Sequence, residues 1–152
     1  PGYPTGSVWT HDTAICAHGL ARAGHPHEAG RAVAALVDVA AASGYRWPEL
    51  FGAEPVGGRP APYPASCRPQ AWAAGAIPYL LTAGLGLHAA GLDRTLRIRR
   101  PSLPRWVNSV EVTQLRVGDA RVDLLFERAG SRVTVTDAHV DGQCDVVLEV
   151  AS

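Results

Sequence analysis

The sequence predicts an α+β protein in which helices come first and a small antiparallel β-sheet follows. Up to about Leu92 the apolar residues are mostly Ala and Leu at helical spacing, and beyond it Val and Leu alternate with polar residues. At 152 residues the chain has about the length of one domain, so one core is expected and not two full ones. We therefore predict a helical region over residues 1–92 and a β tail over residues 93–152.

The first predicted helix covers residues 13–23. Thr10 or Asp12 is placed to cap its start, because short polar side chains accept hydrogen bonds from free N–H groups there. Gly24 is placed to end it. The predicted buried face holds four residues at helical spacing: Ile15, Gly19, Leu20 and Ala23.

Two further helices are predicted. The second covers residues 27–43, follows Pro26 and ends at Gly44. The third starts at Pro69, since proline suits the first position of a helix, and Pro78 is expected to kink or restart it. The apolar residues at helical spacing in the second helix are Val33, Leu36, Val37 and Ala40.

Residues 45–68 form a long segment between the second and third helices that is rich in proline and glycine. It carries the aromatic residues Trp47, Phe51 and Tyr63. A connection of this length without a helix or strand is uncommon in a compact domain unless it has a function. We therefore expect an ordered loop that contributes to a site.

The β tail is predicted as an antiparallel sheet of about five strands with a structural role. Turn residues at 118–119, 129–130 and 141–142 separate alternating segments. These segments contain no cluster of His or Cys. The predicted strands are 96–99, 110–117, 121–127, 132–136 and 146–150.

Charge and cysteine content exclude several classes of function. Fourteen basic residues balance fourteen acidic ones, so nucleic-acid binding and attachment to an anionic membrane are not expected. No apolar run is long enough to span a bilayer and no signal peptide is evident, which favours a cytoplasmic protein. Cys16, Cys67 and Cys144 are odd in number and widely spaced, so we expect buried or idle thiols. His25 and His27 lack a third ligand, so no metal or other cofactor is predicted.

Several segments resemble one enzyme family in order and spacing: residues 3–15, 48–52, 63–64, 69–76 and 115–128. They resemble the C-terminal part of bacterial amylo-alpha-1,6-glucosidase, the glycogen-debranching-like family. The resemblance implies an (α/α)6 toroid that hydrolyses alpha-glucosidic bonds with inversion, of which this chain supplies the last helices and a tail. The lack of Met also fits a segment of a longer protein. Thr10 and Arg68 depart from the family's pattern, so specificity could differ.

The resemblance implies a catalytic carboxyl pair, of which this chain supplies one member. An inverting glycosidase needs two carboxyls about 6.5–9.5 Å apart. Glu49 is the candidate general base, between Trp47-Pro48 and Leu50-Phe51; alternatively it caps or solvates the loop, with Glu54 as a second candidate. Asp12 lies at a helix start, which stabilises its charge, so it is read as a sugar ligand or a cap. The general acid is expected upstream.

The predicted sugar-binding residues combine aromatic rings with polar groups. A pyranose presents a C–H face to an aromatic ring and hydroxyls to polar side chains. Trp72 is expected in the core instead. Gln70 can reach a hydroxyl or satisfy backbone groups. The predicted substrate-binding set is Trp9, His11, Asp12, Trp47, Tyr63 and Gln70.

The expected partners are an alpha-glucan substrate and either the remainder of the toroid or a second copy of the chain. The alternative function is a carbohydrate-binding or oligomerisation fragment without catalysis. As part of a glycoside hydrolase, the chain alone is expected to be inactive, because the second carboxyl is elsewhere.

Overall fold

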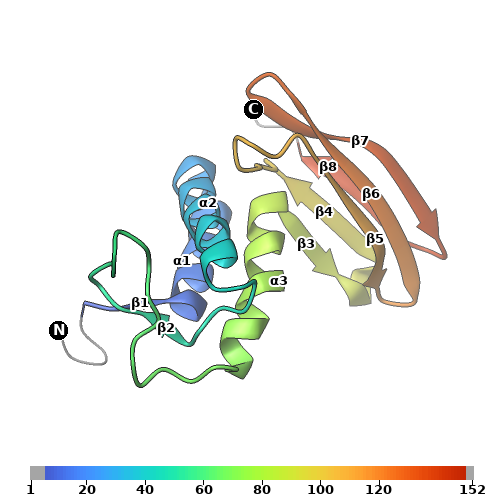
Figure 1. The fold of residues 1–152 in the computed structure, drawn as a ribbon. Helices are drawn as coiled ribbons and strands as arrows, with labels where there is room; N and C mark the ends of the chain where they lie inside the picture. Colours follow the sequence, from blue (N-terminus) through green and yellow to red (C-terminus); the bar gives the residue numbers. More distant parts are fainter. Residues whose placement is uncertain (1–5, 150–152) are drawn as a thin grey trace. The chain divides into compact units, whose positions relative to one another are not determined.

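The computed structural model describes residues 6–149 and divides the chain into two compact units, Pro1–Ala83 and Gly84–Ser152 (Figure 1). The first unit is helical and the second is built from strands, so the predicted α+β class is confirmed. The division falls before Leu92, because strand β3 (Leu87–Ala90) already belongs to the second unit. Each unit has its own hydrophobic cluster, and the expectation of a single core is wrong.

Helix α1 (Thr10–Arg22) begins before the predicted start at residue 13. Trp9 occupies the N-cap position without a side-chain capping bond, and Asp12 lies inside the first turn, so the predicted cap by Thr10 or Asp12 is wrong. The Thr10 hydroxyl is buried and donates to the carbonyl oxygen of Pro48, 3.4 Å away. Thr10 therefore ties the start of the helix to the distant loop and does not cap it.

The buried face of α1 also differs from the predicted one. Ala14 and Ala17 are fully buried, whereas Ile15 is 46% exposed. Small side chains let two helices approach closely, and α1 packs against α2 (Pro26–Ala42). The alanines therefore decide which side of α1 faces the core, and the larger Ile15 stays at the surface.

Helix α2 matches its prediction to within one residue at each end. Val33 and Leu36 are buried, as the spacing indicated. Gly44 follows with a φ of +62°, and the N–H of Tyr45 donates to the carbonyl of Ala40 at 2.7 Å. This is the usual way for a chain to satisfy its last carbonyls and leave a helix.

Helix α3 (Ala71–Leu85) starts two residues after the predicted Pro69, which follows a cis peptide bond. The helix continues through Pro78, so that residue does not restart it. Gly86 ends it with a φ of +66°, at a point where an added Cβ would lie 1.9 Å from the carbonyl oxygen of Arg99. Only glycine fits this junction, which turns the chain from α3 into β3.

The long loop completes the first unit. Strand β1 (Val8–Trp9) pairs antiparallel with strand β2 (Leu50–Phe51), which joins the start of α1 to the loop. Trp47 and Phe51 from the loop are buried with the helices. The core of the first unit consists of Ala14, Ala17, Val33, Leu36, Trp47, Phe51, Ala73, Ala76 and Leu80.

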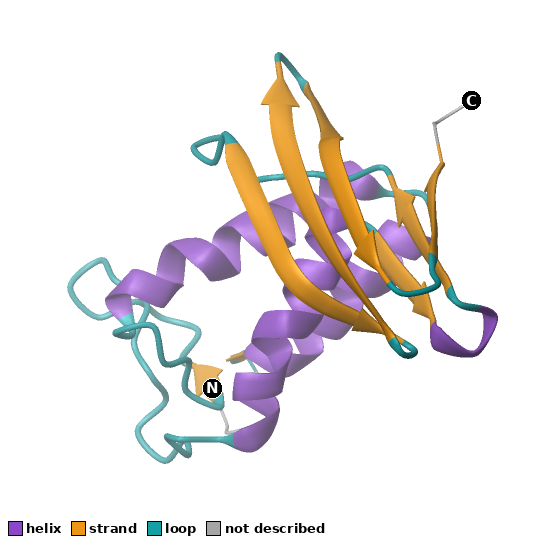
Figure 2. Ribbon diagram, turned by 90° about the vertical axis from the view of Figure 1, so that its right-hand side faces the viewer, coloured by secondary structure: helices purple, strands orange, loops and turns teal. Residues whose placement is uncertain are grey.

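The second unit contains two three-stranded sheets (Figure 2), in the orders β3-β4-β8 and β5-β6-β7. Both sheets contribute to one core, with Leu96 and Ile98 from the first and Leu124 and Phe126 from the second. The remaining bounds are β4 (Thr95–Arg99), β5 (Ser109–Val117), β6 (Ala120–Ala129), β7 (Arg132–Asp141) and β8 (Asp145–Glu149).

The last strand corrects the predicted antiparallel topology. β8 pairs with β4 in parallel, so the bend at Asp141-Gly142 is not a hairpin turn. Alternation of apolar residues indicates a strand but does not identify its partner. The predicted end of this strand, Val150, lies outside the described residues. The predicted hairpin turns after Val117 and after Ala129 are present.

Candidate functional site

The candidate site combines the start of α1, the long loop and the start of α3. The β1–β2 pairing sets Trp9 opposite Leu50, next to Glu49. The hydrogen bond from Thr10 to Pro48 holds the loop on the other side of that carboxylate. Three of the segments that carry the family resemblance, residues 3–15, 48–52 and 69–76, therefore meet within the first unit. Of the first segment, Tyr3 to Thr5 lie outside the described residues.

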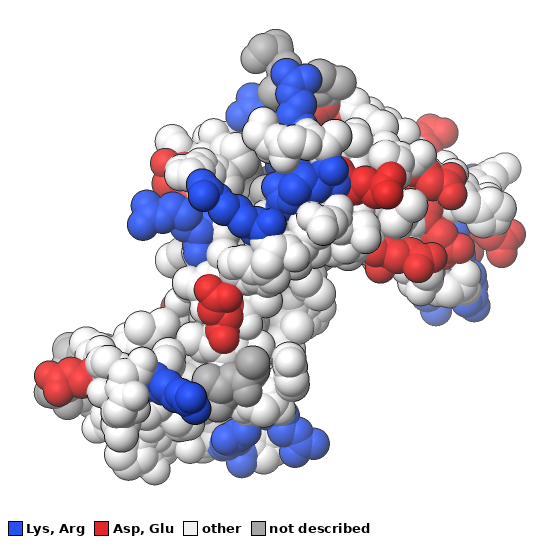
Figure 3. Space-filling model, turned by 45° about the horizontal axis from the view of Figure 1, so that its top comes forward, with Lys and Arg blue, Asp and Glu red and all other residues white. Residues whose placement is uncertain are grey.

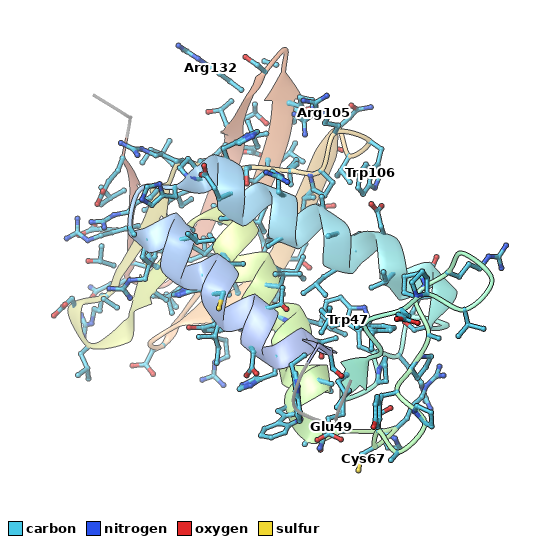
Figure 4. The ribbon with its side chains drawn as sticks, turned by 90° about the vertical axis from the view of Figure 1, so that its left-hand side faces the viewer. Trp47, Glu49, Cys67, Arg105, Trp106 and Arg132 are labelled. Atoms are coloured by element: carbon cyan, nitrogen blue, oxygen red, sulfur yellow. The ribbon has the colours of Figure 1, made fainter. Side chains whose placement is uncertain are left out.

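The Glu49 carboxylate is buried in the loop (Figure 4). Its Oε2 accepts a hydrogen bond from the backbone N–H of Cys67 at 3.2 Å. The Glu49 N–H in turn donates to the Cys67 carbonyl oxygen at 3.1 Å. The side chain thus ties two arms of the loop together, and its 5% exposure rules out a merely solvated role. A carboxylate held in this way keeps a fixed orientation.

Trp72 lies between two residues of the α1 start. Its ring centroid is 5.9 Å from that of Trp9, edge to face, and 5.4 Å from that of His11, in a stack with an interplanar angle of 16°. Trp72 is 45% exposed, so its predicted place in the core is wrong. We call Trp9, His11 and Trp72 the aromatic cluster. Asp12 adjoins it, with Oδ1 3.5 Å from His11 Nδ1.

The reason for this exposure is the periodicity of α3. Its buried residues Ala73, Ala76 and Leu80 follow the helical spacing, and Trp72 lies beside that stripe. Sequence reasoning assigned Trp72 to the core because tryptophan is large and apolar. The position of the alanines was the signal that could have placed it at the surface.

A second stacked pair follows one heptad further along both helices. The rings of His18 and Tyr79 are 4.5 Å apart, and Tyr79 Oη lies 3.2 Å from His18 Nδ1. Burial, and to a smaller extent the charge of Arg22, lowers the pKa of His18 below its usual 6.5. Because His11 meets Trp72 and His18 meets Tyr79, α1 and α3 run parallel.

The remaining predicted sugar ligands have other contacts in the first unit. Trp47 is 6% exposed in the core, and its indole N–H finds no hydrogen-bond partner among the described residues. Gln70 Oε1 accepts from the N–H of Ala71 at the start of α3, which is the backbone role considered for it. Tyr63 is half-buried, and its N–H donates to the carbonyl of Leu50, which places it across the loop from Glu49.

The cysteines and histidines of the described residues provide no metal centre. Cys16 and Cys67 are free and exposed, and Cys144 is free and partly buried, so burial, one of the two alternatives expected, does not hold for the first two. His25 and His27 are exposed. Over residues 6–149 no group of three His, Cys, Asp or Glu side chains is placed to hold a metal ion.

Charged side chains of both signs lie at the surface (Figure 3). The face drawn in Figure 3 carries groups of both arginine and carboxylate side chains. In the part of the chain that the structure describes, no helix is both long and apolar enough to cross a membrane. Comparison of the chain with protein-family models, with curated proteins and with solved structures finds no match.

Proposed function

We propose that this chain is the C-terminal part of an inverting glycoside hydrolase that acts on alpha-glucans, with alpha-1,6 bonds as the preferred target. The observation that carries the proposal is the convergence of the resembling segments. The α1 start, the Glu49 loop and the α3 start meet through the β1–β2 pairing, the Thr10–Pro48 hydrogen bond and the stacking on Trp72. Separate functions would not require these segments to meet.

The helix arrangement supports the (α/α)6 toroid as the parent fold. α1 and α3 run parallel, and the short connection of residues 23–25 makes α2 antiparallel to α1. A toroid of helical hairpins repeats this order, with alternate helices in one layer. Ile15, Tyr79 and Leu81 are exposed apolar residues of α1 and α3, and the next helices of the toroid, or a second copy of the chain, would cover them.

Glu49 is the proposed general base. Its fixed carboxylate would take a proton from a water molecule that attacks the anomeric carbon, while a carboxyl outside this chain protonates the leaving oxygen. The reaction needs two carboxyls and water, and no cofactor is proposed. Trp72 would stack on the C–H face of a glucose ring, with Trp9 beside it, edge to face, and with His11 and Asp12 bonding the sugar hydroxyls.

The test is Glu49→Gln in the longer protein, with Glu54→Gln as the matched control. The amide that replaces the Glu49 carboxylate keeps an oxygen to accept from the Cys67 N–H, so the loop should fold. Glucose release from an alpha-1,6-branched dextrin is expected to fall by about 10²–10⁴-fold, the usual contribution of a general base. Glu54 is exposed, so its variant should stay active. Near-normal turnover of the Glu49 variant would remove Glu49 from the mechanism.

A carbohydrate-binding fragment without catalysis is the second candidate. The aromatic cluster favours it, because Trp72 is exposed and could stack on a sugar whether or not Glu49 reacts. In that case Trp72→Ala would weaken glucan binding. Glu49→Gln would leave glucan binding unchanged, and it would also leave unchanged any glucose release measured with the longer protein. The pair of variants therefore separates the two candidates.

A further inference from the structure

The loop between β4 and β5 holds an aromatic side chain in solvent. The N–H of Val107 donates to the carbonyl of Pro104 at 2.9 Å, which closes a four-residue turn with Trp106 as its third residue. Glycine, asparagine and aspartate are the residues that usually occupy such turns. Trp106 is 55% exposed, whereas Leu103 of the same loop packs against the core. More than half of the Trp106 surface is therefore open to a ligand.

Arg128 of β6 fixes this turn. Its guanidinium donates to three backbone carbonyls, those of Leu103 at 2.7 Å, Pro104 at 2.8 Å and Val107 at 3.2 Å. Its own N–H donates to the carbonyl of Asn108 at 2.8 Å. The turn is thus held on both sides of Trp106. A ring presented by a rigid turn loses little conformational entropy when it binds a ligand.

Two more guanidinium groups lie at the same end of the second unit. Arg105 precedes Trp106, and Arg132 begins β7 (Figure 4). Both are exposed, and within residues 6–149 neither makes an ion pair. Planar guanidinium groups donate several hydrogen bonds in fixed directions and are suited to neighbouring hydroxyls.

We propose that Trp106, with Arg105 and Arg132, forms a second glycan-binding site on the second unit. One glucose ring of an alpha-glucan stacks its C–H face on Trp106, and the guanidinium groups donate to hydroxyls along the same glucan chain. The choice of alpha-glucan as the ligand rests on the proposed function. The site itself does not, because it shares no residue with the aromatic cluster or with Glu49. It would hold the polysaccharide without taking part in bond cleavage.

The test measures binding of maltoheptaose to the whole chain by calorimetry, and of glycogen by affinity electrophoresis. Trp106→Ala and Arg105→Ala are compared with Leu92→Ala, whose side chain is fully exposed and lies outside the site. Circular dichroism shows that each variant is folded. In a Trp72→Ala background, Trp106→Ala is expected to weaken the remaining binding by about three- to tenfold, while Leu92→Ala leaves it unchanged.

Unchanged binding in the folded Trp106 variant would overturn the site, as would a wild-type chain that binds neither glucan. If Trp72→Ala and Glu49→Gln have no effect on binding or hydrolysis but Trp106→Ala weakens binding, the second site stands and the proposed function fails. If Trp106→Ala leaves binding unchanged while Trp72→Ala and Glu49→Gln have their expected effects, the second site fails and the proposed function stands. The two proposals are therefore tested separately.

Discussion

The two units of the chain differ in the side chains that they bury. The first unit buries small residues such as Ala14, Ala17 and Ala76, and leaves Ile15 and Trp72 about half exposed. The second unit buries large residues, with a closed core between two sheets. Alanines thus make up part of the first core beside large residues such as Trp47 and Phe51, and the first unit carries apolar surface that a substrate or further helices would cover.

Each unit carries exposed aromatic residues at which a ligand would bind. An exposed large apolar residue does not stabilise a fold unless a ligand or partner covers it. In the first unit such residues follow two parallel helices, and the aromatic cluster lies at their N-terminal ends. In the second unit the exposed aromatic residue, Trp106, lies on a turn fixed by Arg128. Both sites are aromatic, but one adjoins a buried carboxylate and the other does not.

The largest expected effect on stability distinguishes the two units. Phe126→Ala removes a fully buried ring from the second core and is expected to lower the free energy of unfolding by about 3–5 kcal/mol. Trp72→Ala removes a half-exposed ring and should cost about 1 kcal/mol or less. Urea unfolding followed by circular dichroism measures both. Equal losses would contradict the comparison, because they would place Trp72 in a core.

The periodicity of apolar residues was sufficient to predict the helices and strands that bury a regular stripe of apolar side chains. It predicted α2 to within a residue at each end, and it predicted the strands of the β5-β6-β7 sheet. It did not reveal the parallel pairing of β8 with β4, since two strands about 50 residues apart share no local signal.

The site was predicted less completely. The loop and Glu49 could be selected from local composition, but Trp47 and Trp72 changed places between site and core. Whether a loop tryptophan is buried depends on which helices lie over it, and no local pattern carries that information. The bonds of Glu49 with Cys67 are likewise long-range and had no signal in the sequence.

A smaller effect is expected at the contact between α1 and the loop. Thr10→Val keeps the shape of the buried side chain but removes its hydrogen bond to Pro48. The loss of one buried hydrogen bond should cost about 1 kcal/mol of stability. If Glu49 is the base, kcat should also fall, because the loop that holds it loses a support.

Thr10→Ser provides the matched control, since it keeps the hydroxyl. Recovery of kcat in that variant supports a positioning role for Thr10. A Thr10→Val protein with unchanged kcat and unchanged stability would mean that the hydrogen bond contributes nothing to either.

The smallest expected effect is a pH dependence of the first unit. His18 has its pKa lowered in the folded chain, mainly by burial and then by Arg22, so the unfolded chain binds the proton more readily. The contribution of His18 to the free energy of unfolding is fully present above about pH 6.5, the pKa of an unfolded histidine. It is lost as the pH drops towards the lower pKa of His18 in the folded chain. His18→Gln should flatten this part of the stability profile, as measured by thermal unfolding between pH 5 and 8. An unchanged profile would show that burial and Arg22 do not lower the pKa of His18 in the folded chain.

The stereochemistry of the first product tests the central claim most directly. A base that activates water on the face opposite the leaving group inverts the anomeric centre. Proton NMR of an alpha-1,6-branched dextrin, recorded within minutes of adding the longer protein, is predicted to show β-glucose before mutarotation. Initial release of α-glucose, or no release of glucose at all, would contradict the role of Glu49 as the base of an inverting hydrolase.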